Sequence, residues 1–166
     1  AAAFEPRAAM PEVRLAQAAE LIGAHVPVEA RLDPILPGVT DGADCLEPLC
    51  GALARVGARK IAASVLFLRP AVIGSLRRHV EDKVMLNRML DQFANAEPLA
   101  IHADNSRVRA LPTQARLEIM ERLKSIAYRH GLEVLVCACK NPDLGGEPCH
   151  READAYLLGD GGPLLL

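Results

Sequence analysis

The sequence is poor in aromatic residues, with three Phe, two Tyr and no Trp among 166 residues. Hydrophobic residues nevertheless make up 51% of the chain, so a core must be built from Ala, Leu, Val and Ile. Charged residues make up a further 24%. This composition excludes an intrinsically disordered chain and is typical of an ordinary globular protein.

The sequence also lacks any apolar run of the roughly 18 residues that a membrane-spanning helix requires. Its first ten residues contain no charged segment followed by an apolar one, so they do not resemble a secretory signal. We therefore expect a cytoplasmic protein with no membrane partner. The net charge of -2 gives no support to a wholly basic nucleic-acid-binding domain, although it is compatible with a local basic patch.

The cysteine pattern is unlike that of a disulfide-stapled secreted domain. The chain has an odd number of cysteines at uneven spacing, namely Cys45, Cys50, Cys137, Cys139 and Cys149. We interpret them as reduced thiols, some of which are candidate metal ligands. Cys50 falls on the apolar stripe of a predicted helix and is expected to be a core residue. Cys45 is five residues away on the same helix and therefore points in a different direction.

Hydrophobic periodicity divides the chain into alternating helices and strands. Helices are predicted at 11–24, 43–56, 71–95 (in one or two pieces) and 113–130, with strands at 28–33, 60–68 and 133–139. Residues 96–112 are expected to be irregular. The alternation predicts an α/β fold of parallel βα units. Three strands are too few for a closed barrel and would suit part of a barrel or a small three-layer sheet.

The ends of the three predicted strands carry the most informative side chains. Arg31 and Asp33 end the first strand, Arg69 follows the second, and Cys137 and Cys139 end the third. Ligands of parallel βα folds bind at the carboxyl ends of the strands. One reading of the charged residues is a solvated, salt-bridged face. If the strands line a barrel interior, the charges must instead be paired or used, because their desolvation is costly.

The clustered cysteines point to a metal or an iron–sulfur cluster. Cys137 and Cys139 are two residues apart on a predicted strand and so share a face. A loop rich in Gly and Pro separates them from Cys149 and can fold it back. A fourth ligand could come from His150, Cys45, Cys50 or an outside molecule. Three Cys with His150 would suit zinc, whereas three Cys alone on a [4Fe–4S] cluster would leave one iron open. The alternative is that Cys137 is a small buried hydrophobe and the other two thiols are incidental.

Three stretches together resemble the C-terminal half of radical SAM enzymes related to spore photoproduct lyase and to DNA repair photolyase-like proteins. They are RLDPILPGVTD (31–41), VLFLRP (65–70) and ARLEIMERLKSIAYRHGLEVLVCACKNPDL (115–144). The resemblance covers residues 10 to 150 and implies the later strands of a partial (β/α)6 barrel. It also implies that Arg31, Asp33 and Arg69 face the interior near cofactor or substrate. Cys137, Cys139 and Cys149 would be ligands of an auxiliary [4Fe–4S] cluster.

The sequence departs from this family in one respect, because it has no CxxxCxxC motif to hold the cluster that cleaves S-adenosylmethionine. The chain is therefore either the C-terminal part of a longer enzyme, which we expect, or a stand-alone relative that has lost radical chemistry. Residues 1–150 would be the βα domain and 151–166 a tail. S-adenosylmethionine would be used only together with the missing N-terminal half or with a partner chain that completes the barrel. Nucleic acid is a partner by the resemblance alone, and no catalytic residue or substrate is assigned.

Two other hypotheses belong to different functional classes. The chain could be a non-catalytic zinc-binding or interaction domain, in which the metal stabilises the C-terminal loop. It could also be a metal-free α/β domain that assembles with a partner supplying further strands.

Overall fold

The structure is a computed structural model that describes residues 4, 7–101, 106–136, 138 and 140–145. Its elements, in chain order, are α1 (Pro11–Gly23), β1 (Ala30–Ile35), α2 (Ala43–Arg55), β2 (Lys60–Val65), α3 (Pro70–His79), α4 (Lys83–Asp91), β3 (Glu97–Ile101), β4 (Ser106–Ala110), α5 (Thr113–Arg129) and β5 (Glu133–Val136). No helix in the described part of the chain is long and apolar enough to cross a membrane.

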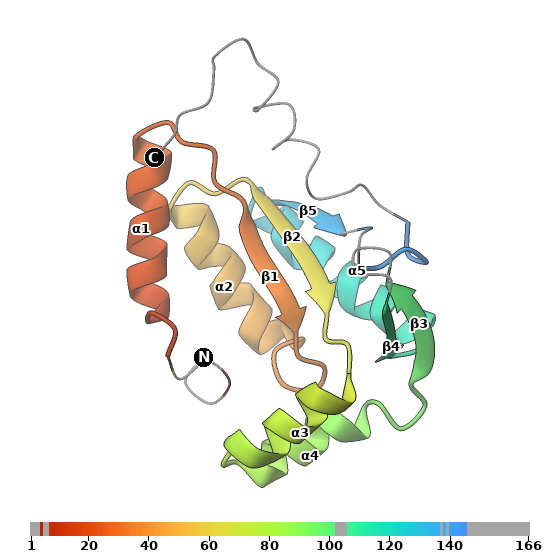
Figure 1. Cartoon of the computed structure of the whole chain (residues 1–166). Coiled ribbons are helices and arrows are strands. Elements are labelled where there is room, and N and C mark those ends of the chain that lie inside the picture. Colours follow the sequence, from red (N-terminus) through yellow and green to blue (C-terminus); the bar gives the residue numbers. More distant parts are fainter. Residues whose placement is uncertain (1–3, 5–6, 102–105, 137, 139, 146–166) are drawn as a thin grey trace, which may run out of the picture.

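The strands β1, β2 and β5 form a parallel sheet in the order β1-β2-β5 (Figure 1). Arg31 pairs with Ala62, which in turn pairs with Leu135 across the sheet. The predicted α/β class is therefore confirmed. The central strand β2 is buried from Ile61 to Val65, as its nearly all-apolar sequence predicts.

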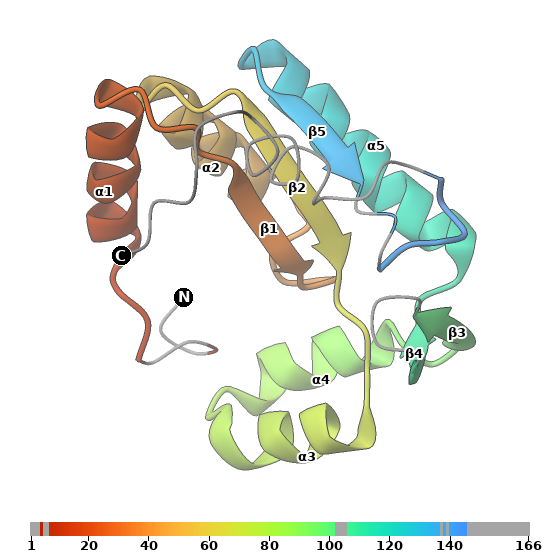
Figure 2. The same ribbon diagram turned by 45° about the horizontal axis from the view of Figure 1, so that its top comes forward.

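Helices α2 and α5 cover one face of this sheet, as Figure 2 shows. Their apolar side chains, among them Leu46 of α2 and Leu123 of α5, pack with Ile61 and Ala63 of β2 in one buried cluster. Successive side chains of a strand point to opposite faces. Arg31 and Asp33 therefore belong to the other face of the sheet.

Helix α1 lies beside β1, on the side away from β2 (Figure 1). Leu15 and Ile22 contact the core, yet α1 has no buried residue. The order β1-β2-β5 makes β1 an edge strand of the described sheet. Helix α1 thus lies beside the edge strand β1 and covers little of the sheet.

The bounds predicted for two strands, β1 and β2, were wrong. Strand β1 begins later than expected and continues through Pro34, which an edge strand tolerates because one side of its ladder is unused. Strand β2 ends at Val65 rather than residue 68. Strand β5 is described only as far as Val136, so part of the predicted strand lies outside the described residues.

The segment predicted to be irregular forms the antiparallel pair β3–β4. Its signal was the alternation in β4, where Arg107 and Arg109 are exposed while Val108 and Ala110 are buried. The prediction of an irregular segment was therefore wrong for these residues. Leu68 pairs with Arg109 and so joins the hairpin to the segment after β2.

Candidate functional site

The three parallel strands end at the same edge of the sheet, and Asp33 lies at that edge on β1. Its side chain is only 13% exposed and lies 3.9 Å from the guanidinium of Arg31. The ammonium group of Lys140 also pairs with the Asp33 carboxylate. A mostly buried carboxylate is thus neutralised by cations from two segments far apart in the sequence.

The Asp33–Lys140 pair brings the segment after β5 across the sheet. Lys140 follows β5, which is one edge strand, whereas Asp33 belongs to β1, the other edge strand. The contact therefore spans the width of β2 at its carboxyl end. Cys137 and Cys139 lie between Val136 and Lys140 in the chain but outside the described residues, as does Cys149.

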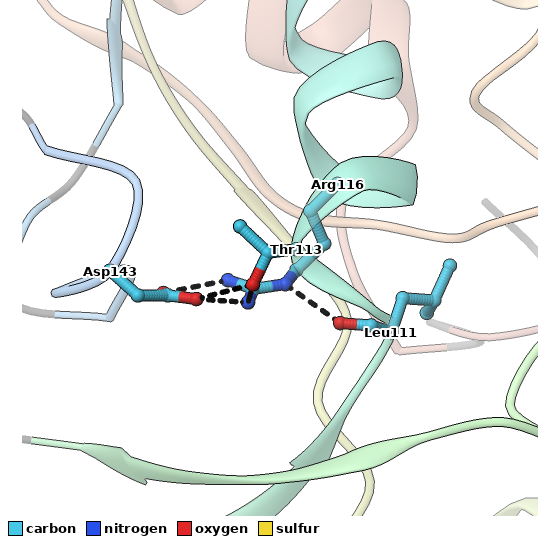
Figure 3. A network of polar contacts seen from close by, with 4 residues as sticks. All are labelled: Leu111, Thr113, Arg116 and Asp143. Atoms are coloured by element: carbon cyan, nitrogen blue, oxygen red, sulfur yellow. Dashed lines mark hydrogen bonds and ion pairs between the residues drawn. The ribbon is translucent and has the colours of Figure 1, made fainter.

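A second ionic contact anchors the same segment to α5, and Figure 3 shows it. Arg116 is 2% exposed, and its two terminal nitrogens donate to the two carboxylate oxygens of Asp143, one of them at 3.0 Å. Arg116 Nε donates to the carbonyl of Leu111 at 2.9 Å. The hydroxyl of Thr113 donates to Asp143 at 3.0 Å. The guanidinium is thus buried with a bidentate partner.

This network changes the acidity of Asp143. Hydrogen bonds from Arg116 lower the pKa of the Asp143 carboxyl below its ordinary value, against the smaller opposing effect of burial. Removing one member would leave a buried charge or carbonyl without compensation. The segment around Lys140 is therefore held at two points, by β1 and by the start of α5.

Arg116 and Asp143 were missed by the sequence reasoning. The available signal was helical spacing, because Arg116 precedes Ile119 by three residues and Leu123 by seven on the apolar stripe of α5. A charged residue on such a stripe must find a partner. Nothing in the spacing identifies Asp143, which lies 27 residues away.

The structure brings together only part of the predicted strand-end set. Arg31 and Asp33 are in contact, as expected from their spacing on β1. Arg69 lies at the start of α3, and its guanidinium donates to the hydroxyl of Ser106 at 2.9 Å. This contact directs Arg69 to the β3–β4 hairpin.

The two described cysteines lie on α2. Cys50 is fully buried in the core, which confirms its predicted role, and burial raises the pKa of its thiol. Cys45 is partly buried, and its thiol contacts the carbonyl of Val39 at 3.5 Å. Among the residues that the structure describes, no group of three or more His, Cys, Asp or Glu side chains could hold a metal ion.

Comparison with known proteins gives no relative for this chain. No family model matches the sequence, and neither a curated protein nor a solved structure matches it. The function must therefore be argued from the site itself.

Proposed function

We propose that this chain is the C-terminal βα part of a radical SAM-type enzyme, and that Cys137, Cys139 and Cys149 hold an auxiliary iron–sulfur cluster. The observation that carries the proposal is the Asp33–Lys140 pair. It holds Lys140, which follows Cys139 directly in the chain, at the carboxyl edge of the parallel sheet, where βα folds bind their ligands.

The layering of the sheet supports a sector of a partial barrel. The helix between β1 and β2, α2, and the last helix between β2 and β5, α5, lie on the same face of the sheet (Figure 2). A doubly wound sheet has helices on both faces, whereas a barrel has them outside only. The other face, which carries Arg31 and Asp33, would then line the barrel interior. In the described sheet β1 and β5 are the edge strands, so further strands of a barrel would have to join there.

The proposed donor set fits a [4Fe–4S] cluster. Thiolates are the usual ligands of such clusters, and three would leave one iron open. When bound, the cluster would supply electron transfer or an open coordination position. The chain itself contributes positioning, because Asp33 holds Lys140 and Arg116 holds Asp143, and both of these residues lie between Cys139 and Cys149 in the chain. Without a CxxxCxxC motif, this chain alone would not cleave S-adenosylmethionine.

Anaerobic purification with iron, sulfide and zinc analysis tests the proposal. We expect a brown protein whose iron and sulfide are lost when Cys137 and Cys139 are both replaced by Ala. Cys45→Ala is the matched control, because Cys45 is partly buried on α2 and is not a proposed ligand. Full iron occupancy in the Cys137→Ala, Cys139→Ala chain would show that these are not the ligands.

The same measurement separates the zinc alternative. Stoichiometric zinc without sulfide would favour a non-catalytic domain in which His150 completes a Cys3His site. Such a protein would be colourless, and chelators would lower its stability. If the purified protein contained neither iron nor zinc, the cluster proposal would be rejected. The chain would then be an α/β domain whose partner supplies further strands.

A further inference from the structure

The pairing of β1 with β2 changes register near the carboxyl end of the two strands. Between Leu32 and Ile35, β1 takes three residue steps while its partner β2 takes two. Both of these residues contact the core on the helical side of the sheet. The extra residue forms a β-bulge, a feature that re-aims side chains and is rare between parallel strands. The bulge leaves Asp33 and Pro34 together opposite Ser64 of the central strand.

Ser64 lies beside Asp33 on the face of the sheet that α2 and α5 do not cover. Ala63 and Val65 belong to the buried cluster on the helical side, so alternation directs Ser64 to the other face. Ser64 is fully buried there, and its hydroxyl donates to the carbonyl of Val65 at 3.3 Å. A carboxylate and a hydroxyl thus lie on adjacent strands at the carboxyl edge, where βα folds bind their ligands.

The cation closest to Asp33 comes from outside the sheet. It is the ammonium group of Lys140, which pairs with the carboxylate oxygen Oδ2. Arg31 approaches the same oxygen only to 3.9 Å, which is beyond hydrogen-bond distance. The Lys140 side chain is 39% exposed, whereas that of Asp33 is 13% exposed. Because a lysine ammonium lies on a flexible four-carbon stem, it can leave a carboxylate that the strand holds in place.

The segment that carries Lys140 has a second anchor. Arg116 is 2% exposed, and both of its terminal nitrogens donate to the Asp143 carboxylate. Residues 140–145 would therefore keep an attachment to α5 if Lys140 left Asp33. The carboxylate at the bulge is thus a fixed part of the sheet, and the ammonium that neutralises it is replaceable.

We infer that Asp33 and Ser64 form a binding site for the primary ammonium group of a small-molecule ligand, and that Lys140 fills this site as an internal substitute. One carboxylate neutralises one ammonium, whereas a metal ion requires several ligands. An ammonium has three donors, so it can donate to Asp33 and to the Ser64 hydroxyl oxygen together. A ligand would displace Lys140 while Arg116 continues to hold Asp143. This site goes beyond the proposed function, because it requires no cluster.

Removing Lys140 makes the site available to a probe. The probe is n-butylammonium, which has the four-carbon stem and the ammonium group of lysine. We expect it to raise the melting temperature of the Lys140→Met variant in a saturable manner, measured by circular dichroism at constant ionic strength. The shift should be at least threefold larger than in the wild type, where Lys140 competes for Asp33. Tetramethylammonium has the same charge but no N–H donor, so it should give no shift beyond that of NaCl.

Two further variants are matched controls for this measurement. Lys140→Met combined with Asp33→Asn removes the carboxylate and should abolish the saturable shift. Lys124→Met removes a lysine of α5 whose pair with Glu121, at 2.9 Å, lies on the surface. Because Glu121 is exposed to water, n-butylammonium should produce no saturable shift in the Lys124→Met variant.

Deuterium exchange tests whether Lys140 is instead a structural anchor. Exchange in residues 140–145 of the Lys140→Met variant should stay within twofold of the wild type, because Arg116 still holds Asp143. Lys140→Gln keeps a polar side chain at this exposed position. It repeats both measurements, so that a folding defect of the Met variant leaves the test intact.

Three outcomes would overturn the inference. They are the absence of a saturable shift in both Lys140 variants, an equal shift when Asp33→Asn is added, and a tenfold faster exchange in residues 140–145. The last would show that Lys140 is required to hold its segment. No metal is involved, so an iron-free chain whose Lys140→Met variant binds n-butylammonium would reject the cluster and retain the ammonium site.

Discussion

Helices α1 and α5 have similar sequence patterns and opposite burial. Both carry apolar residues at helical spacing, with Leu15 and Ile22 in α1 and Ile119 and Leu123 in α5. Helix α5 buries six residues between α2 and the sheet, whereas α1 buries none. The difference comes from their positions, because α5 covers paired strands and α1 lies beside an edge.

This contrast separates two kinds of information in an amphipathic pattern. The pattern predicts that a helix forms and which face is apolar. It does not predict how much of that face another element covers.

The largest expected loss of stability comes from a Leu→Ala change in α5, and the same change in α1 is its matched comparison. Leu123 of α5 is fully buried, so Leu123→Ala should lower the free energy of unfolding by about 2–5 kcal/mol. Leu21 of α1 is about half exposed, so Leu21→Ala should change it by less than about 0.5 kcal/mol. Urea unfolding followed by circular dichroism measures both. Comparable losses would mean that α1 is covered to the same extent as α5.

A second prediction concerns the charged residue within the buried face of α5. Arg116→Met should destabilise the protein by about 2–3 kcal/mol, because Asp143 keeps the hydrogen bond from Thr113 but loses those from Arg116, and the Leu111 carbonyl loses the hydrogen bond from Arg116. The loss is limited since Asp143 is partly exposed. Arg122→Met is the control on the exposed side of α5, where the pair with Asp41 is worth at most about 1 kcal/mol. Equal losses in urea unfolding would contradict a special role for Arg116.

The fold was easier to predict than the site, because different interactions determine them. Local periodicity identified α2 and α5, and the apolar sequence of β2 predicted a strand buried on both faces. Pairing between segments that are distant in the chain gives a weaker signal in the sequence. The β3–β4 hairpin was missed because its alternation spans only five residues per strand and includes two arginines.

The site depends on contacts that spacing does not reveal. The nearness of Arg31 to Asp33 follows from strand geometry. The pairing of Asp33 with Lys140 joins residues 107 positions apart, and that of Arg116 with Asp143 joins residues 27 apart. Neither can be derived from a local pattern.

The third prediction concerns how the stability contributed by the Arg116–Asp143 pair depends on pH. The pKa of Asp143 is lowered in the folded state by Arg116, so its ionised form stabilises the fold at pH values above its unfolded pKa of about 3.9. That contribution should decline as the pH falls below about 4, through the folded pKa. The difference in unfolding free energy between the wild type and Asp143→Asn should therefore shrink in acid. Urea titrations at several pH values measure it, and a difference that grew in acid would have the wrong sign.

The smallest expected effect lies on the solvent side of the α2–α5 contact. Arg129 donates to Glu47 at 2.6 Å and His130 lies 2.9 Å from it, and these hydrogen bonds lower the pKa of the Glu47 carboxyl. Because Glu47 is exposed, water and salt screen these interactions. Glu47→Gln should thus leave the melting temperature within the scatter of replicate scans, with 0.5 M NaCl removing any residual difference. A clear loss that persists in salt would show that polar surface contacts, and not only the apolar face, make α5 more firmly held than α1.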